Sequence, residues 1–490
     1  MKIGYLQVIN LILFCRMKVN SRMFRGYDVR GVVGEDLSTE IAEHFGRAHG
    51  TYLKRAGIKK AVVGRDCRAT SSDYSNAVIR GLLWTGLDVV DIGMTLVGTF
   101  YWAQYHLQAP GGVFVTASHN PAEYNGFKFA NDYSETLVSE GIQELRQMME
   151  SEKYDEGETK GTLTAVEIHN PYIEDLKKRL SIDKKFKVVI DASKGTAGTV
   201  VPPVLRDFGM EVVESNCDID PTFPLGTPDP TETRVAERLR TKVLEVGADI
   251  GFAFDTDGDR IGIVDEKGGI IWNDVLVALF AIEVLHYHPG ATIMYNLLCS
   301  KTVEDTIVAY GGKPFLWRVG HSFLKKKNQE VGAAFIGELS GHFFFSADFY
   351  NHDDGIYSAL RLLSYLSLSG LTLSEAVAKL PLYVSSPEIK LFCADEEKEA
   401  LMKKIAPILE KDFPEAEVIA DERAGDGVRL NLSDGILVVR YSQNGPYITI
   451  KFEGKDQARY DELKIYVNNL LRQFKEIDWS KEAVNVESLA

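Results

Sequence analysis

The 490-residue sequence has no apolar run as long as the roughly 18 to 20 residues that a helix needs to span a bilayer. It is also poor in cysteine: its five cysteines are widely and irregularly spaced, and none forms a CxxC pair. This spacing excludes a disulfide scaffold and the usual zinc motifs. We therefore predict a protein with no membrane association in a reduced, cytoplasmic setting.

Basic residues are fewer than acidic ones. The chain has 55 Lys and Arg against 70 Asp and Glu, which gives a formal net charge of -15. Nucleic acids are bound by extended basic surfaces, so we expect no nucleic-acid partner. An anionic small ligand would instead need a local basic cluster. The length predicts roughly three or four domains, because single cores stop growing near 250 to 300 residues.

Residues 1–22 are predicted to be a leader that precedes the folded chain. Lys2 comes before an apolar run from Val8 to Cys15, which is similar to a weak signal-peptide core but lacks a small-residue cleavage site. Met17 and Met23 lie just ahead of the first motif, so an upstream start codon explains the segment better than a targeting function.

The first three quarters of the chain alternate short apolar, β-branched runs with Gly/Ser/Asp-rich turns and helix-like segments, which is typical of βαβ units. Clear runs begin at Ala61, Gly111, Lys187 and Ile250. Ligands gather beyond the carboxyl ends of strands in open α/β sheets, so the turns after these runs are expected to border one crevice. The likeness of VFVTAS to VVIDAS indicates a repeated domain plan.

The pattern changes after the segment from Pro381 to Pro387. Strand-like runs and helical spacing then alternate without the βαβ order, which predicts a smaller α+β domain. The segments concerned are 396–410 and 461–474, expected to be helical, and 435–440 and 447–452, expected to be strands.

The loop DTDGDR carries three alternating aspartates, Asp255, Asp257 and Asp259. A tightly turned backbone, eased by Gly258, can bring the three carboxylates to one face, and hard oxygen ligands suit Mg²⁺. An EF-hand is excluded, because Arg260 occupies the loop position that needs glycine and both flanks are β-like. A solvated acidic turn is the remaining alternative. Arg260 either neutralises the aspartates or adds a positive partner for a phosphoryl group.

The segment TASHNP displays Ser118 after a strand-like run, because Asn120 and Pro121 favour a turn. The GxSxG frame of esterases is absent, and no Asp and His relay is evident. On its own this segment could be a simple Asn-Pro turn. The following YNGFK adds Lys128, which could carry a proton or bind phosphate. We interpret Ser118 as a nucleophile.

These two loops, together with GELSGH at 337–342 and RYSQNGPY at 440–447, resemble the α-D-phosphohexomutase superfamily, most closely its bacterial phosphomannomutase/phosphoglucomutase group. The likeness runs from about Phe24 to Phe474. It implies an α/β fold with three related α/β domains, built on mixed sheets, plus a smaller C-terminal α+β domain around a central cleft. The expected domains are a phosphoserine domain (23–160), a metal-binding domain (161–268), a sugar-recognition domain (269–380) and a phosphate-binding domain (381–490).

The resemblance also implies the chemistry. The family's serine, phosphorylated at rest, corresponds to Ser118, and Mg²⁺ is held by that phosphate and by Asp255, Asp257 and Asp259. The phosphoserine gives its phosphoryl group to a hexose monophosphate, and the resulting hexose 1,6-bisphosphate turns around and returns its other phosphate. The expected reaction is therefore reversible transfer between C1 and C6 of mannose and glucose phosphates, in a monomer or weak homo-oligomer.

The remaining site residues follow from the same resemblance. Lys128 and His342 are candidates for proton transfer, and Arg260 lies beside the metal. The residues expected to bind the substrate are Arg25, Tyr27, Arg30, His119, His321, Glu338, Ser340, Arg440, Ser442, Gln443 and Asn444. Arg65 and Arg68 either face the cleft or pin the first domain. One departure is visible: in NLLCSK, Leu298 stands near the place where the bacterial group often carries a lysine, and Lys301 is displaced.

Three other functions stay open. Phosphoglucosamine mutases are similar at the serine and metal loops, and their sugar loop typically reads GEQSGH where this chain has Leu339. A catalytically silent sugar-phosphate-binding protein should have lost the serine or an aspartate, and none is lost. A phosphatase would let water attack the phosphoserine, which a cleft that holds a bisphosphate during its reorientation should prevent.

Overall fold

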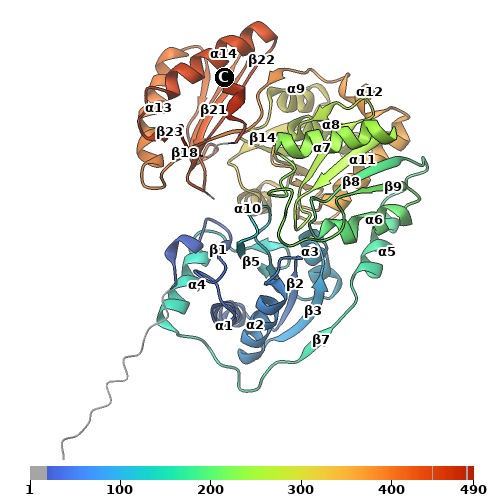
Figure 1. Cartoon of the computed structure of the whole chain (residues 1–490), viewed down its shortest axis with the longest axis vertical. Helices are drawn as coiled ribbons and strands as arrows, with labels where there is room; N and C mark the ends of the chain where they lie inside the picture. The colour runs from blue at the N-terminus through green and yellow to red at the C-terminus, as the bar shows by residue number, and fades with distance from the viewer. Residues whose placement is uncertain (1–18, 444, 482–483, 490) are drawn as a thin grey trace, which may run out of the picture.

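The computed structural model describes residues 19–443, 445–481 and 484–489, which form four β-sheets in succession along the chain (Figure 1). Most of the predicted leader lies outside the described residues. Its last residues contact the first domain: Ser21–Met23 forms a short 3-10 helix (η1), and Asn20 Nδ2 donates to Asp36 Oδ1 at 2.8 Å. In Figure 1 the first domain is at the bottom and the C-terminal domain at the upper left.

The first sheet is mixed, with the strand order β1-β5-β4-β2-β3-β7 and with β6 paired to β5. Its strands are β1 (Val29–Val32), β2 (Lys60–Arg65), β3 (Asp88–Met94), β4 (Gly111–Val115), β5 (Tyr124–Asp132), β6 (Glu135–Thr136) and β7 (Leu163–Ala165). Its helices are α1 (Thr39–Arg55), α2 (Ser71–Trp84), α3 (Val97–His106) and α4 (Glu140–Ser151). Because β7 pairs with β3, the first sheet takes a strand from beyond residue 160; the domain boundaries stay predictions.

Helices α1 and α2 pack unusually closely. A Cβ added at Gly46 would lie 2.3 Å from the backbone oxygen of Val78, and one added at Gly81 would lie 2.3 Å from that of Glu43. Only glycine allows this approach. Ser38 is the N-cap of helix α1. Its hydroxyl accepts from the amide of Ile41 and so satisfies one of the free N–H groups of the first turn.

The second sheet has the order β12-β11-β10-β8-β9, in which β8, β9 and β10 are parallel and β11 and β12 antiparallel. Its strands are β8 (Lys187–Asp191), β9 (Glu211–Ser215), β10 (Ile250–Phe254), β11 (Ile261–Asp265) and β12 (Ile270–Ile271). Its helices are α5 (His169–Arg179), α6 (Ala197–Asp207) and α7 (Thr233–Val246). Strand β10 is buried throughout, as expected for a central strand covered on both faces.

The third sheet has the order β14-β13-β15-β16 and is also mixed. Its strands are β13 (Thr292–Asn296), β14 (Lys313–Trp317), β15 (Phe335–Gly337) and β16 (Phe343–Phe344). Its helices are α8 (Asn273–Tyr287), α9 (Lys301–Ala309), α10 (His321–Val331), α11 (Gly355–Ser369) and α12 (Leu373–Val377).

The C-terminal sheet is antiparallel, with the order β19-β20-β21-β22-β18-β23 and with β17 paired to β22. Its strands are β17 (Val384–Ser385), β18 (Ile389–Cys393), β19 (Glu417–Ile419), β20 (Gly427–Leu432), β21 (Gly435–Tyr441), β22 (Tyr447–Gly454) and β23 (Ile477–Asp478). Helices α13 (Lys398–Asp412) and α14 (Gln457–Leu471) pack on it, and a 3-10 helix, η2 (Val486–Leu489), follows.

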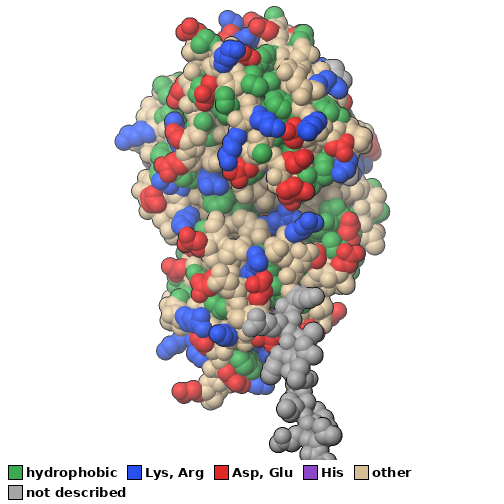
Figure 2. All heavy atoms as spheres, turned by 90° about the vertical axis from the view of Figure 1, so that its left-hand side faces the viewer, with side chains coloured by type: hydrophobic (Ala, Val, Ile, Leu, Met, Phe, Trp, Pro, Cys, Tyr) green, Lys and Arg blue, Asp and Glu red, His purple; other side chains and the backbone are tan. Residues whose placement is uncertain are grey.

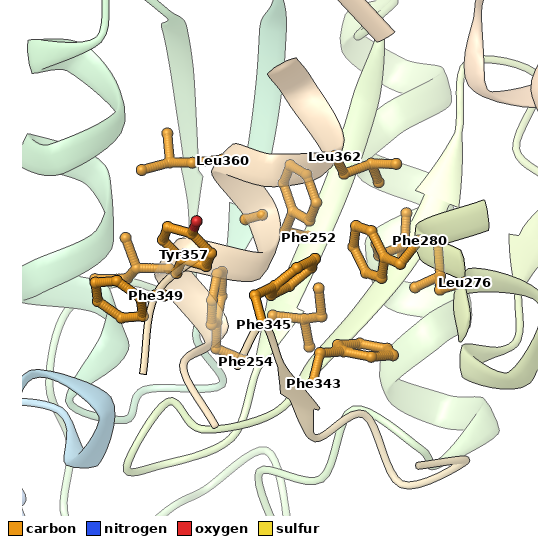
Figure 3. Close-up of a cluster of buried hydrophobic side chains, with 14 of the residues drawn as sticks. Phe252, Phe254, Leu276, Phe280, Phe343, Phe345, Phe349, Tyr357, Leu360 and Leu362 are labelled. Carbon is orange, nitrogen blue, oxygen red and sulfur yellow. The ribbon is translucent and has the colours of Figure 1, made fainter. Parts of the chain in front are cut away.

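One hydrophobic core spans the second and third domains and also takes in residues of the first domain, among them Phe100 and Trp102 of α3. Phe252 of β10, Phe280 of α8, Phe343 of β16 and Tyr357 of α11 converge there (Figure 3). The rings of Phe280 and Phe343 lie 5.1 Å apart between centroids. The C-terminal domain has a separate core between its sheet and its two helices. The loops of the second and third domains are therefore held at fixed positions relative to each other.

The predicted fold class, three related α/β domains on mixed sheets and a smaller C-terminal α+β domain, is confirmed. The strand-like runs from Ala61, Gly111, Lys187 and Ile250 are strands β2, β4, β8 and β10. No helix in the described part of the chain is long and apolar enough to cross a membrane.

Candidate active site

Ser118 lies in the turn after β4, with its backbone in the left-handed region at a φ of 49°. Its amide donates to Thr116 Oγ1 at 2.8 Å. A serine in this conformation costs about 1–3 kcal/mol, which the surrounding structure must supply. The residue is 3% exposed, and its side chain lines an internal cavity. The turn therefore displays one hydroxyl at the end of a buried strand.

Two arginines hold this turn. Arg68 donates to the carbonyl oxygens of Ser118 and Asn120, each at 2.6 Å, and to two further carbonyls of the loop. Of the two alternatives for Arg68, its four contacts support the pinning role. Arg30 donates to Asn120 Oδ1 at 2.6 Å and also pairs with Asp28, while its guanidinium lines the cavity.

The aspartate loop connects the antiparallel strands β10 and β11, so strands flank it on both sides as the sequence predicts. Asp255, Asp257 and Asp259 are at most 1% exposed, and their carboxylate oxygens lie within 4.8 Å of one another. Ser118 Oγ donates to Asp255 Oδ2 at 3.0 Å across 137 residues of sequence. The structure thus brings the predicted nucleophile and the predicted metal ligands together.

Two buried cations face these carboxylates. Lys128 Nζ donates to Asp257 Oδ2 at 2.8 Å and to Asp259 Oδ2 at 2.5 Å. Arg260 Nε donates to Asp255 Oδ2 at 2.9 Å. Burial alone would lower the pKa of Lys128, but Asp257 and Asp259 outweigh it and raise that pKa well above its usual value. Lys128 therefore stays a cation.

The three carboxylates fit a divalent cation. Burial and the charge of Asp259 raise the pKa of Asp255 well above its usual value, because a buried carboxylate is poorly solvated and the negative groups repel one another. Among the described residues, Asp257 Oδ1 and Asp259 Oδ1 are buried without a hydrogen-bond partner. Unpartnered buried carboxylate oxygens are costly, and hard oxygen ligands of this kind suit Mg²⁺.

The sugar loop of the third domain directs Glu338 into the cavity. Glu338 Oε1 accepts from Asn296 Nδ2 and from the amide of Gly320, each at 3.0 Å, which fixes the carboxylate. Leu339, the position at which this loop differs from GEQSGH, is 6% exposed and packs in the hydrophobic core. Its side chain does not line the cavity, so it cannot read the sugar directly.

Two histidines of the third domain stack on each other. The rings of His321 and His342 lie 4.9 Å apart at 16°. His342 Nδ1 is 2.7 Å from Asp353 Oδ2, and Asp353 is fully buried beside Lys325. Burial lowers the pKa of His321; for His342, Asp259 and Asp353 outweigh burial and raise the pKa. His342 thus holds a proton more readily than its neighbour.

The C-terminal domain supplies a second cationic position. Arg440, at the end of β21, donates through Nε and Nη2 to both oxygens of Asp426, at 2.9 and 2.6 Å. This bidentate pair fixes the plane of the guanidinium. Lys398 Nζ donates to the carbonyls of Ser442 and Gly445 at 2.6 and 2.8 Å, which shapes the turn after β21.

One cavity gathers most of the predicted site residues. Seen from the side where the first and C-terminal domains face each other, the surface is hollowed at mid-height and carries Lys and Arg side chains there (Figure 2). The predicted residues that line the cavity are Ser118, Lys128, His342, Arg260, Tyr27, Arg30, His119, His321, Glu338, Ser340, Arg440, Ser442 and Gln443.

The other predicted residues lie elsewhere. Arg25 lines a neighbouring groove between the first and C-terminal domains, together with Ser139 and Lys398. The three aspartates lie behind Ser118 and Lys128, and Asn444 is outside the described residues. Five further residues either line the cavity or hold residues that do, and the sequence did not point to them: Asn296, Asp353, Asp426, Glu388 and Lys390. Asn296 opens the NLLCSK segment, where only Leu298 and Lys301 drew attention, and the other four belong to no motif.

The three α/β domains repeat one turn after a parallel strand. The amide of Ser118 donates to Thr116, that of Ser193 to Asp191, and that of Leu298 to Asn296, always to the side chain two residues back. Ser118 and Ser193 even share a left-handed backbone, with φ values of 49° and 47°. The repeat predicted from VFVTAS and VVIDAS extends to the third domain.

A serine hydroxyl lies beside a carboxylate trio, and a separate arginine position lies in the same cavity, which is the arrangement of an enzyme that transfers phosphoryl groups. Models of the phosphoglucomutase/phosphomannomutase family, α/β/α domains I, II and III, match residues 21–156, 170–269 and 272–383. A phosphomannomutase/phosphoglucomutase of Pseudomonas putida is 37% identical over 451 residues, which are 92% of this chain and 96% of the relative.

Two further comparisons agree. A phosphoglucomutase of Neisseria meningitidis is 31% identical over 458 residues, or 93% of this chain and 98% of the relative. The crystal structure of a phosphoglucomutase/phosphomannomutase family protein from Burkholderia thailandensis superposes with a TM-score of 0.85 at 32% identity, covering 93% of this chain and 98% of that one. The chain therefore belongs to the phosphoglucomutase/phosphomannomutase family, as its motifs indicate.

Proposed function

We propose that this enzyme moves a phosphoryl group reversibly between C1 and C6 of mannose and glucose phosphates, through a phosphoserine at Ser118 and a hexose 1,6-bisphosphate. The observation that carries the proposal is the 3.0 Å contact between Ser118 Oγ and Asp255 Oδ2 in a cavity that also holds Arg440. The names of the relatives from Pseudomonas and Neisseria support the substrate class.

In the transfer step, the bond between Ser118 Oγ and phosphorus breaks while a sugar hydroxyl oxygen forms a new bond to phosphorus. Lys128 is held as a cation by two carboxylates, so it suits a phosphoryl oxygen better than a proton. The neutral imidazole of His342, oriented by Asp353, is the proposed acceptor of the hydroxyl proton, and Ser118 Oγ takes up a proton as its bond to phosphorus breaks, which restores the serine hydroxyl. Arg260 lies on the other side of the aspartates and stabilises the transferring charge.

The metal belongs to this proposal. Mg²⁺, when bound, would neutralise charge on the transferring phosphoryl group, and Asp255, Asp257 and Asp259 with the phosphoserine would hold it. This chain's own contribution is a buried pocket in which the three carboxylates are already gathered and two of their oxygens lack a hydrogen-bond partner among the described residues.

The two ends of the sugar are held by different domains. Glu338 is fixed through Oε1, and its carboxylate is proposed to accept hydrogen bonds from two neighbouring hydroxyls of the sugar, together with Ser340. A carboxylate can do this with the sugar ring in either orientation. Tyr27, Arg30, His119 and His321 line the walls around it. The phosphate that is not reacting is proposed to bind Arg440 and the turn with Ser442, Gln443 and Asn444. Because this pocket is fixed, the bisphosphate must turn around between the two half-reactions.

The setting proposed for the enzyme is the cytoplasm, as a monomer or weak homo-oligomer that binds small sugar phosphates and needs hexose 1,6-bisphosphate for activity. Of the described cysteines, Cys67, Cys217, Cys299 and Cys393 are all free thiols, which agrees with a reducing compartment.

A comparison of three substrates tests the function. With Mg²⁺ and catalytic glucose 1,6-bisphosphate, purified enzyme is expected to convert glucose 1-phosphate and mannose 1-phosphate to their 6-phosphates, because the relative from Pseudomonas putida is named for both activities. Coupled assays measure kcat/KM for these and for glucosamine 1-phosphate. Preferential turnover of glucosamine 1-phosphate would assign the alternative mutase, and release of inorganic phosphate at the rate of turnover would assign a phosphatase.

The Arg440→Ala variant is expected to raise the KM for glucose 1-phosphate at least about tenfold, because a charge-assisted hydrogen bond to phosphate contributes about 1.5–3 kcal/mol. Its kcat should change less, since Arg440 lies on a different domain from Ser118. Arg459→Ala is the matched control: Arg459 pairs with Asp434 in the same domain, outside the cavity, and should leave both constants unchanged. A lower kcat at constant KM would contradict the assigned role.

A further inference from the structure

Strand β18 carries a lysine into the active-site cavity. Ile389, Leu391 and Cys393 enter the core of the C-terminal domain, and this alternation turns Lys390 to the opposite face of the sheet. Lys390 lines the cavity and its side chain is 24% exposed. It belongs to no motif in the sequence.

The sheet register places Lys390 in one row with Arg440. Lys390 on β18 is paired with Thr449 on β22, and Thr449 is paired with Arg440 on β21. Directly paired residues of antiparallel strands present their side chains on the same face, and all three side chains line the cavity. Neighbouring strands lie about 4.8 Å apart, so the backbones of Arg440 and Lys390 are about 10 Å apart.

The other Lys and Arg side chains of the cavity are already hydrogen-bonded to carboxylates: Arg30 to Asp28, Lys128 to Asp257 and Asp259, Arg260 to Asp255, and Arg440 to Asp426. Lys390 differs from them. Its nearest carboxylate in the described part of the chain is that of Glu388, at 3.7 Å, which is beyond hydrogen-bond distance. Its three N–H donors are therefore available to a ligand.

The ammonium of Lys390 is charged at neutral pH. Glu388 raises its pKa above the ordinary value; burial opposes this, and Asp229 of the second domain adds to it. Thr231 and Arg260 of the second domain line the same cavity. In the strand order β21-β22-β18, Lys390 lies two strands away from β21.

No cation comes from the third-domain loop after β13. Leu298 is 2% exposed and packs in the hydrophobic core. Lys301 Nζ pairs with Asp305 at 3.4 Å along α9, and it does not line the cavity. The second cation of the row, at the end away from Arg440, therefore comes from the C-terminal domain itself, as Lys390.

We propose that Lys390 is a substrate-binding residue whose ammonium donates to a phosphate oxygen of the bound sugar phosphate. The inference rests on the proposed function, because it takes a phosphate monoester dianion as the ligand. A hydroxyl would match only the donors of the ammonium, whereas a phosphate matches both its charge and its three donors. The C-terminal sheet then binds the ligand through two cations in one cross-strand row.

The test compares Lys390→Met with Lys390→Arg, and uses Lys301→Met as the matched control that removes the same charge outside the cavity. The expected result is a KM for glucose 1-phosphate raised about tenfold in Lys390→Met, with kcat changed less and with most of the loss recovered in Lys390→Arg. Calorimetry should show a similar loss of affinity for glucose 1,6-bisphosphate. Added salt should weaken binding less in Lys390→Met than in the wild type, since one screened charge pair is gone.

A KM and a bisphosphate affinity within twofold of the wild type in Lys390→Met would overturn the inference, and so would equal losses in Lys390→Met and Lys390→Arg, which would indicate a steric role. These outcomes are separate from failure of the proposed function. A wild-type enzyme that binds glucose 1,6-bisphosphate but turns over none of the three hexose 1-phosphates would reject the function, while the calorimetric comparison would still decide the role of Lys390.

Discussion

The Ser118→Ala variant is expected to lose mutase turnover by at least about four orders of magnitude, because removal of a covalent nucleophile leaves only binding and electrostatic effects. The Ser118 hydroxyl lies 3.0 Å from Asp255, and alanine removes the atom that carries the phosphoryl group while leaving the buried turn almost unchanged in volume. The measurements are turnover of glucose 1-phosphate in a coupled assay and peptide mass analysis, which should find phosphate on the Ser118 peptide of the wild type only.

Ser193→Ala is a matched control for this variant. Ser193 follows strand β8 in the same left-handed turn, with a φ of 47° and its amide bonded to Asp191. Its hydroxyl accepts from Arg238 Nη2 at 2.6 Å within the second domain and does not line the cavity. Turnover of Ser193→Ala should stay within about twofold of the wild type. Phosphate found only on other peptides, or turnover retained in Ser118→Ala, would refute the assignment of the nucleophile.

The turns that carry chemistry could be predicted from the sequence because each is a contiguous motif at a strand end. TASHNP and DTDGDR follow buried strands β4 and β10, and the rule that ligands gather at carboxyl ends of strands placed Ser118 and Asp255 on one crevice. The repeated domain plan was visible in the likeness of VFVTAS to VVIDAS, and the shared turn geometry of Ser118 and Ser193 gives it a physical basis.

The supporting residues could not be predicted, because sheet register and packing bring them to the site. Asp426 meets Arg440 through the pairing of β20 with β21, and Lys390 reaches the cavity only because β18 pairs with β22. Asn296 fixes Glu338 across parallel strands 42 residues apart in sequence. Single residues such as these have no local pattern.

The Asp257→Asn variant is expected to lose about a hundredfold or more in turnover at a fixed Mg²⁺ concentration, because it removes one charged oxygen ligand of the proposed metal site. Asp257 Oδ1 is buried and has no hydrogen-bond partner among the described residues, so it is free to coordinate a cation. Asparagine keeps the shape of the side chain but loses its charge. The concentration of Mg²⁺ that gives half-maximal turnover should therefore rise, and calorimetry should show weaker Mg²⁺ binding.

Asp265→Asn controls for charge and fold. Asp265 ends strand β11, beyond the aspartate loop, is 5% exposed, and accepts from the amides of Lys267 and Gly269 in a turn outside the cavity. The Asp265→Asn substitution removes the same charge from the same domain and should leave the Mg²⁺ dependence of turnover unchanged. Equal Mg²⁺ dependence in both variants would mean that Asp257 holds Lys128 and not the metal.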